Sequence, residues 1–215
     1  MSAAADTLPG NAKVTRQDWL DAAMDVLVSD GSDRVKILTL ADKLEVSRSS
    51  FYWYFKDRDE LLRALLEHWL ATNTRAIVTA AKASSETITG AVCTVFKAFV
   101  DPRRFDVRLD FAVRDWARRS ARVREVLEAS DAQRIDALAA MFASHGLDPT
   151  ESLIRGRVLY YMQIGYFDAD LQETMEERAA LIPYYLLTFT GVAGRADEIE
   201  DLQRFTLALG KETRT

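Results

Sequence analysis

Residues 37–62 carry the sequence ILTLADKLEVSRSSFYWYFKDRDELL, and this stretch decides the fold. It predicts two short helices joined by a tight turn at Glu45 and Val46, followed by a third helix with its own capping residues. The second short helix carries serines, an arginine and aromatic residues where a core helix would carry leucines. This pattern is typical of a helix-turn-helix whose second helix lies in the major groove of DNA.

Capping residues mark the ends of the helices in and around this stretch. Thr15 is expected to cap a first helix that ends at Gly31. Thr39 and Ser47 are expected to cap the two short helices, and Asp57 the long helix that follows them. Hydroxyl and carboxylate side chains suit these positions because they accept hydrogen bonds from the free N–H groups of a first helical turn.

Beyond residue 80 the apolar residues recur with helical spacing. Residues 105–113 alternate like a strand, but no partner strand is evident elsewhere, so a helix is favoured there as well. Pro183 is expected to kink or divide the last major helix. One helix is expected from Ile88 until Asp101 and Pro102 stop it, and another includes 105–113. The further helices expected cover 121–144, 149–167 and 172–190.

The predicted fold class is all-α, with an N-terminal three-helix DNA-binding domain followed by a larger helical domain. The predicted segments are a flexible tail over 1–12, the helix-turn-helix domain over 13–60, the helical domain over 61–191 and a C-terminal tail over 192–215. Within that last tail, residues 197–209 are compatible with a short helix.

Composition fits this class, although the net charge of −5 at first argues against nucleic acid. Within 34–58, six Lys and Arg residues stand against three Asp and Glu residues, a local charge of +3, and charge at the contact surface decides phosphate attraction. No apolar run is long enough for a membrane span, and the N-terminus does not resemble a secretory signal. The single cysteine, Cys93, is predicted to be a buried thiol in a reducing cytoplasm.

The helix-turn-helix stretch resembles the N-terminal domain of the tetracycline-repressor (TetR) family. The resemblance covers about residues 15–65. The later part of the chain is similar only in length and helical character. The shared motif consists of Thr39, Ala41-Asp42-Lys43-Leu44, Val46-Ser47, Arg48-Ser49-Ser50, Phe51-Tyr52-Trp53-Tyr54-Phe55, Lys56 and Glu60-Leu61-Leu62.

The resemblance implies that residues 47–54 form the recognition helix, and that some of its side chains contact bases while others contact phosphates. Arg48 and the serines after it would face base edges, where an arginine bonds guanine in two places. Other side chains would hold phosphates and fix the register. Trp53 stands where a small or polar residue is commoner, and would contact a thymine methyl or a sugar. The implied DNA-binding set is Thr39, Ser47, Arg48, Ser49, Ser50, Tyr52, Trp53, Tyr54, Lys56 and Arg58.

Plainer interpretations remain for several of these residues. Phe51 and Phe55, four apart, are expected in the core of the domain. Tyr52 would serve equally as a half-buried core residue, Lys56 as a solvated lysine and Arg48 as a phosphate contact alone. Tyr54 stands where many relatives carry histidine, which changes the expected phosphate contact.

The resemblance further implies a homodimer through residues 149–190 and a small-molecule effector in the helical domain. Because ligand cavities are mostly apolar, aromatic residues are candidates for the lining of an effector pocket near Trp116. The set chosen is Phe96, Phe99, Phe111, Trp116, Phe142, Tyr160 and Tyr161, with Tyr166 and Phe167 as further candidates.

An arginine-rich segment, residues 103–124, allows two interpretations. It is either a site for an anionic effector or a set of salt bridges to solvent-facing acids and to the acidic first helix, at Asp18, Asp21 and Asp25. The second is favoured, because Asp110 with Arg114, and Asp115 with Arg119, have the spacing of helical ion pairs.

Catalytic chemistry has little support in the sequence. There are two histidines and one cysteine, with no metal-binding or nucleotide-binding motif, so no catalytic residue, metal or cofactor is expected. The function expected is a TetR-like repressor in the cytoplasm that binds double-stranded operator DNA and is released by an effector. The alternative is an all-helical enzyme or ligand carrier with a vestigial helix-turn-helix.

Overall fold

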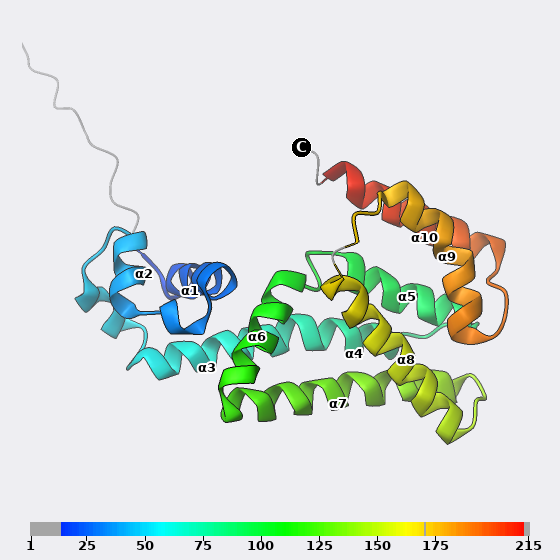
Figure 1. Ribbon diagram of the computed structural model, residues 1–215, viewed down its shortest axis with the longest axis horizontal. Helices are drawn as coiled ribbons and strands as arrows, with labels where there is room; N and C mark the ends of the chain where they lie inside the picture. The colour runs from blue at the N-terminus through cyan, green and yellow to red at the C-terminus, as the bar shows by residue number, and fades with distance from the viewer. Residues whose placement is uncertain (1–13, 170, 213–215) are drawn as a thin grey trace, which may run out of the picture. The chain divides into compact units, whose positions relative to one another are not determined.

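A computed structural model describes residues 14–169 and 171–212. The chain divides into two compact units, Met1–Leu65 and Leu66–Thr215, so the division falls inside a helix rather than at residue 60. No strand occurs among the described residues, in agreement with the predicted all-α class (Figure 1). The tail predicted over 1–12 lies outside the described residues.

The N-terminal unit is built around three aromatic rings. Trp19 packs edge-on against Phe51, with ring centroids 5.2 Å apart, and Phe51 stacks on Phe55 at 5.4 Å. All three side chains are buried, which confirms the core role expected for Phe51 and Phe55. The elements that supply the core are α1 (Arg16–Asp30), the 3-10 turn η1 (Ser32–Arg34), α2 (Ile37–Lys43), the 3-10 helix η2 (Arg48–Trp53) and the start of α3 (Arg58–Trp69).

Two of the predicted caps are wrong. Thr15 does cap α1, in a reciprocal capping box with Asp18. However, α2 begins at Ile37 with Lys36 as its N-cap, so Thr39 is an exposed residue inside the helix. The Ser47 hydroxyl makes no hydrogen bond to the start of η2, because it pairs with the Ser49 hydroxyl at 2.8 Å instead.

The recognition segment is a 3-10 helix rather than the α-helix predicted over 47–54. Its backbone bonds span three residues, from the Ser50 N–H to the Ser47 carbonyl and from the Tyr54 N–H to the Phe51 carbonyl, both 3.0 Å. Before it, Glu45 adopts a φ of 55°, a left-handed conformation in the turn of the helix-turn-helix. Residues other than glycine, asparagine and aspartate seldom adopt that backbone conformation.

The C-terminal unit is a bundle of packed helices. Residues 105–113 belong to a helix as expected, since Asp106 caps α6 through the Leu109 N–H. The helix predicted over 172–190 continues through Pro183 without division. The elements are the end of α3, the π-helical segment η3 (Leu70–Thr74), α4 (Arg75–Ala81), α5 (Ile88–Val100), α6 (Val107–Arg119), α7 (Ala121–Ser144), α8 (Pro149–Asp168), α9 (Met175–Thr190) and α10 (Ala196–Glu212).

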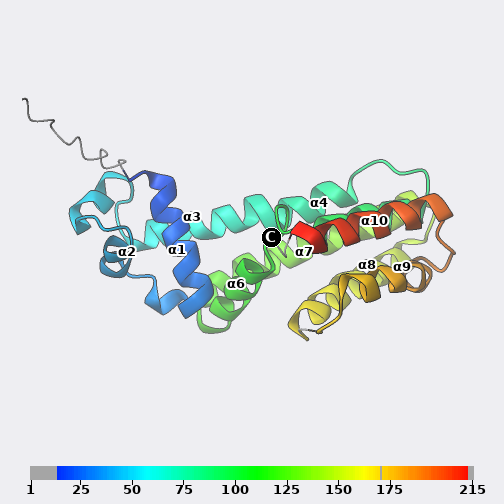
Figure 2. The same cartoon turned by 90° about the horizontal axis from the view of Figure 1, so that it is seen from above.

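Residues 196–212 of the predicted C-terminal tail form a helix, α10, which is longer than the short helix considered over 197–209. It packs against α5 and α9 and buries Leu202 and Leu209. Figure 2 shows α10, in red, lying along this side of the bundle. The charged residues that suggested a tail occupy the solvent face of an amphipathic helix. Opposite it α7 packs along α8, where a Cβ on Gly156 would come within 3.0 Å of the Ala139 backbone nitrogen. Glycine therefore permits this close contact.

A polar network crosses the interior of the same unit. Asp110 and Arg134 are both fully buried and form an ion pair at 3.1 Å. The Trp69 indole donates to Asp110 at 2.8 Å, and the Tyr160 hydroxyl donates to Asp131 at 2.6 Å. Burial opposes ionisation of Asp110, but the charges of Arg134 and of Arg114 outweigh it and hold its pKa below the usual value. The network thus joins α3, α6, α7 and α8 through satisfied buried charges.

Candidate DNA-binding surface and ligand cavity

The surface of η2 carries the side chains that sequence reasoning placed there. Arg48 and Ser49 are exposed, Tyr52 is 52% exposed and Trp53 is 78% exposed. They flank Phe51, whose burial anchors the segment. Ser50 is half-buried, and its hydroxyl donates to the Ser47 carbonyl at 2.8 Å. The exposure of Tyr52 shows that this ring does not belong to the core.

Other members of the predicted set lie on both sides of η2. Thr39 on α2 and Lys56 before α3 are exposed. Lys36 and Leu38 at the start of α2 are exposed too, and Leu38 to 61%. The predicted DNA-binding set did not include these two residues. The position of Leu38 outside the apolar stripe of α2 could have indicated that it is exposed.

Tyr54 and Arg58 both bond backbone carbonyls of their own unit. The Tyr54 hydroxyl donates to the Val14 carbonyl at 2.7 Å. The Arg58 guanidinium donates to the carbonyls of Val35 and Ser32, both at 2.6 Å. These bonds use the single O–H of Tyr54 and two of the five N–H groups of Arg58, so the phosphate contacts expected of the two residues stay predictions.

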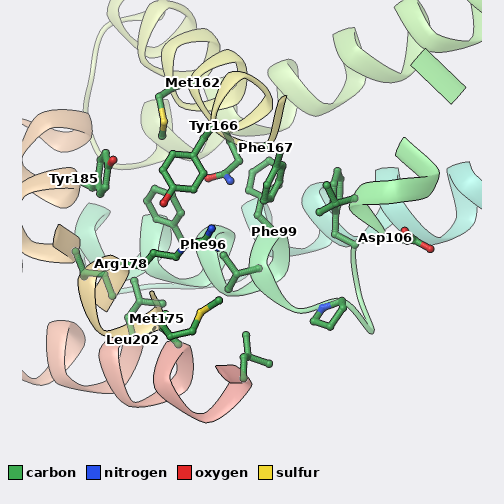
Figure 3. A pocket seen from close by; sticks show the side chains of 18 of the residues that line it. Phe96, Phe99, Asp106, Met162, Tyr166, Phe167, Met175, Arg178, Tyr185 and Leu202 are labelled. Atoms are coloured by element: carbon green, nitrogen blue, oxygen red, sulfur yellow. Dashed lines mark hydrogen bonds between the residues drawn. The ribbon is translucent and has the colours of Figure 1, made fainter. Parts of the chain in front are cut away.

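The second feature is a cavity of about 520 Å³ in the C-terminal unit. In Figure 3, Tyr166 and Phe167 extend from α8 towards Phe96 and Phe99 on α5, while Tyr185 comes from α9. The lining is mainly apolar, as in most small-molecule sites. It consists of Phe96, Phe99, Val100, Pro102, Phe105, Asp106, Val107, Arg108, Met162, Gln163, Tyr166, Phe167, Met175, Arg178, Ile182, Tyr185, Leu186, Leu202, Thr206 and Leu209.

The predicted pocket is right only in part. Of the seven aromatic residues chosen, Phe96 and Phe99 line the cavity. Further along α8, Tyr166 and Phe167 line it as well. The residues that do not line it are Phe111, Trp116, Phe142, Tyr160 and Tyr161.

Four of these five aromatics have a different environment. Phe142 is fully buried in the core, and the Tyr160 hydroxyl belongs to the polar network. Tyr161 is half-exposed and Trp116 is buried on α6; neither lines the cavity, which therefore does not lie at the place predicted near Trp116. Helical spacing identifies a buried face, but the choice between a packed core and an open cavity depends on how the helices meet.

The polar groups of the cavity wall come from α6, α8, α9 and α10. The Tyr166 hydroxyl donates to Glu173, and Arg178 lies over the Tyr166 ring, 5.4 Å from its centroid. Burial, followed by the Glu173 hydrogen bond, raises the Tyr166 pKa, so the phenol stays neutral. On α8, one turn before Tyr166, Gln163 is buried with 4% exposure and lines the cavity. Its position was not anticipated, because a glutamine inside a helix gives no sequence signal.

The arginine-rich segment forms the helical ion pairs expected of it. Arg114 bonds Asp110 at 2.9 Å, and Arg119 pairs with Asp115. The acids of the first helix are engaged within their own unit, where Asp18 caps α1 and Asp25 pairs with Lys43 at 3.0 Å. Asp18 and Asp25 therefore do not form the salt bridges that were predicted between α1 and the arginine-rich segment.

Other chemical features of the described chain are few. Cys93 is buried as predicted, and burial followed by the nearby Glu198 charge raises the pKa of its thiol to about 12. Over residues 14–169 and 171–212, no three His, Cys, Asp or Glu side chains are grouped to hold a metal ion. Within the same residues, none of the helices has the length and apolar character needed to cross a bilayer.

Comparisons with known proteins agree with this architecture. Residues 20–65 match the family described as bacterial regulatory proteins, tetR family. An uncharacterized HTH-type transcriptional regulator of Pseudomonas putida, TtgW, is 40% identical over 55 residues, 26% of this chain and 41% of TtgW. SrpR, an HTH-type transcriptional regulator of the same species, is 38% identical over 55 residues, 26% of each chain. The matches therefore span less than half the length of these curated relatives.

The fold extends the likeness to the whole chain. The crystal structure of Mycobacterium smegmatis AmtR superposes with a TM-score of 0.60 at 18% identity, covering 94% of this chain and 96% of AmtR. Residues 20–65 thus have the sequence of a tetR-family N-terminal domain. The fold of the whole chain, a helix-turn-helix unit followed by a helical unit with a cavity, is similar to that of AmtR.

Proposed function

We propose that this protein is a DNA-binding transcriptional repressor, released from its operator when a small molecule fills the cavity. The observation that carries the proposal is the exposed face of η2, where Arg48, Ser49, Tyr52 and Trp53 surround the buried Phe51. Large exposed aromatic residues beside an arginine mark an interaction surface. Its site of action would be the cytoplasm, where operator DNA is found.

On this surface the side chains have different tasks. Arg48 is proposed to bond a guanine edge in the major groove, with the Ser49 hydroxyl as a less selective partner. Tyr52 and Lys56 are proposed to hold phosphates on either side. Trp53, the most exposed of the aromatics, is proposed to pack on a thymine methyl or a sugar. None of these contacts requires Tyr54 or Arg58.

A homodimer is proposed because α8 and α9 leave apolar side chains in water. Ile154, Val158 and Tyr161 form a stripe on α8, at the spacing of one helical face, and each is at least 50% exposed. On α9, Tyr184 and Leu187 are also exposed. Pairing these helices with those of a second copy would bury the stripe, and would present two recognition segments to successive major grooves, about 34–36 Å apart.

Release is proposed to begin at the cavity wall. Asp106 lines the cavity, and its backbone N–H and carbonyl are held by the Asn73 amide at 3.2 and 2.8 Å. Asn73 belongs to η3, which directly continues α3. A ligand that shifted the Asp106 segment would thus act on the helix that leads from the N-terminal unit. The effect requires that the ligand bind the released state more tightly than the DNA-bound state.

The alternative, a carrier or an all-helical enzyme, has the cavity in its favour. The described residues offer it no group of His, Cys, Asp or Glu side chains placed to hold a metal ion, and it leaves the exposed face of η2 without a purpose. We therefore propose a regulator without catalytic activity.

Arg48→Ala tests the proposal. Genomic fragments retained by the full chain supply the specific DNA, and fluorescence anisotropy measures its affinity and that of unrelated DNA. Arg48→Ala is expected to weaken specific binding by about 1–3 kcal/mol, with a smaller loss on unrelated DNA. Lys56→Ala is expected to weaken both alike and to reduce the salt slope by about one.

Lys82→Ala, an exposed lysine at the end of α4, is the matched control and should leave both affinities unchanged. Equal losses on specific and unrelated DNA for Arg48→Ala would show that Arg48 reads no base. A full chain that retains no fragment above background would refute the DNA-binding function itself.

A further inference from the structure

Arg178 brings an unsatisfied hydrogen-bond donor to the cavity wall. Its side-chain nitrogen Nε is buried and has no hydrogen-bond partner among the described residues, and Arg178 lines the cavity. The Glu173 carboxylate oxygen lies 4.0 Å from Nε, beyond hydrogen-bond length. A buried donor without a partner is costly, more so on a charged group, and such a group in a native protein calls for an explanation.

The neighbours of Arg178 hold its guanidinium in place without satisfying Nε. Nη2 donates to the Leu171 carbonyl at 3.4 Å, a long bond. The guanidinium lies over the Tyr166 ring, and Figure 3 shows Arg178 reaching from α9 towards Tyr166. Glu173 accepts a hydrogen bond from the Tyr166 hydroxyl and is not among the residues that line the cavity. A molecule inside the cavity is therefore the group placed to accept from Nε.

We propose that the cavity binds an amphipathic carboxylate, a molecule with an apolar body and one carboxylate group that accepts a hydrogen bond from Arg178 Nε. This inference rests on the proposed function only in making that molecule the effector, since binding itself needs no DNA. The volume of about 520 Å³ lies within the range of roughly 300–1,000 Å³ common for small-molecule sites. The aromatic lining, Phe96, Phe99 and Phe167 included, would contact the apolar body.

The charges at the cavity favour an anion over a neutral acceptor. The charged residues that line it are Asp106, Arg108 and Arg178, one acid against two bases. A guanidinium matches the planar carboxylate, and a hydrogen bond between charged groups is stronger than one to a neutral carbonyl.

Two effects oppose the binding of an anion at Arg178, and both are limited. The Arg178 side chain is 31% exposed, so a carboxylate bound there keeps part of its hydration and avoids the full cost of burying a charge. Glu173 repels such a ligand, but it lies outside hydrogen-bond reach of Nε, whereas the ligand would bond Nε directly. The direct contact is the shorter one and outweighs the repulsion.

Isothermal titration calorimetry on the full chain at pH 8 tests the inference with two molecules of one chain length, decanoate and 2-decanone. Decanoate is expected to bind at least tenfold more tightly than the ketone. Arg178→Met, an apolar side chain of similar reach, is expected to weaken decanoate binding at least tenfold and ketone binding by a smaller factor. Arg178→Lys, which keeps the charge, should recover part of the loss. Arg124→Met, at an exposed arginine near the start of α7, is the control and should change neither affinity.

Three results would overturn the inference: binding of 2-decanone as tight as that of decanoate, decanoate affinity unaltered in Arg178→Met, or no binding of either molecule. Thermal unfolding shows whether each variant keeps the fold, and the comparison of the two molecules on the wild type needs no variant. The DNA anisotropy assay with decanoate keeps the two proposals apart. Decanoate binding that depends on Arg178 without any DNA binding or release would uphold the ligand chemistry and refute the regulatory function.

Discussion

The aromatic residues at 51–55 divide between the core and the surface of the N-terminal unit. Phe51 packs against Trp19 and stacks on Phe55, whereas Tyr52 and Trp53 face water. The positions of these four aromatics could be predicted, since their spacing separates core from surface. The roles of Tyr54 and Arg58 could not, because their partners are carbonyls of residues distant in sequence, Val14 and Val35 among them.

Glu45 offers a test at this scale. Its φ of 55° strains an L-residue by about 1–2 kcal/mol. Glycine adopts this conformation freely but has more conformational entropy to lose, about 0.5–1 kcal/mol. Glu45→Gly is therefore expected to raise the free energy of unfolding by up to about 1 kcal/mol, measured by urea denaturation of the full chain. Glu45→Ala, which keeps the strain, should bring no gain; equal stabilisation by both would contradict the assignment.

Several helices of the C-terminal unit follow from helical spacing and caps: the ends of α7, α8 and α9 agree with the predicted ranges within a few residues. The Thr174 capping box of α9 and the Asp148 cap before Pro149 of α8 illustrate why. What the pattern could not predict is which side chains meet across helices. Arg134 and Asp110 form an ion pair although they are 24 residues apart, and no local sequence pattern predicts such a pair.

The network predicts a specific sensitivity to charge. Asp110→Asn leaves the buried Arg134 without its full counter-charge and is expected to lower the free energy of unfolding by about 3–5 kcal/mol. Asp115→Asn, which removes the exposed pair with Arg119, should cost less than about 1 kcal/mol. Chemical denaturation of both variants measures the difference, and similar small losses would refute a stabilising role for the buried pair.

The same pair sets a pH dependence. The folded-state pKa of Asp110 lies below its ordinary value of 3.8, because Arg134 and Arg114 outweigh the effect of burial. Its contribution to stability is thus fully present above about pH 4 and is lost as the pH falls towards the folded pKa. The gap in unfolding free energy between wild type and Asp110→Asn should narrow only in that acidic range. A gap that closes near neutral pH would contradict this.

For the whole molecule, the fold class and the order of the two units could be predicted from the sequence, whereas the cavity could not. A cavity is set by the distances between packed helices, so Phe96 and Tyr160 look alike in the sequence although only the first lines it. The proposed repressor also requires a second copy of the chain, since one recognition segment reads only a few base pairs.

Sedimentation velocity on the full chain with a specific DNA duplex tests the central claim most directly. We predict a dimer in solution and two chains on each duplex. Val158→Arg, which places a charge in the exposed α8 stripe, should give a monomer with at least a tenfold loss of specific affinity, whereas Ala132→Arg on the exposed face of α7 should change neither. One wild-type chain per duplex, or a monomeric Val158→Arg protein that binds with undiminished affinity, would contradict the account.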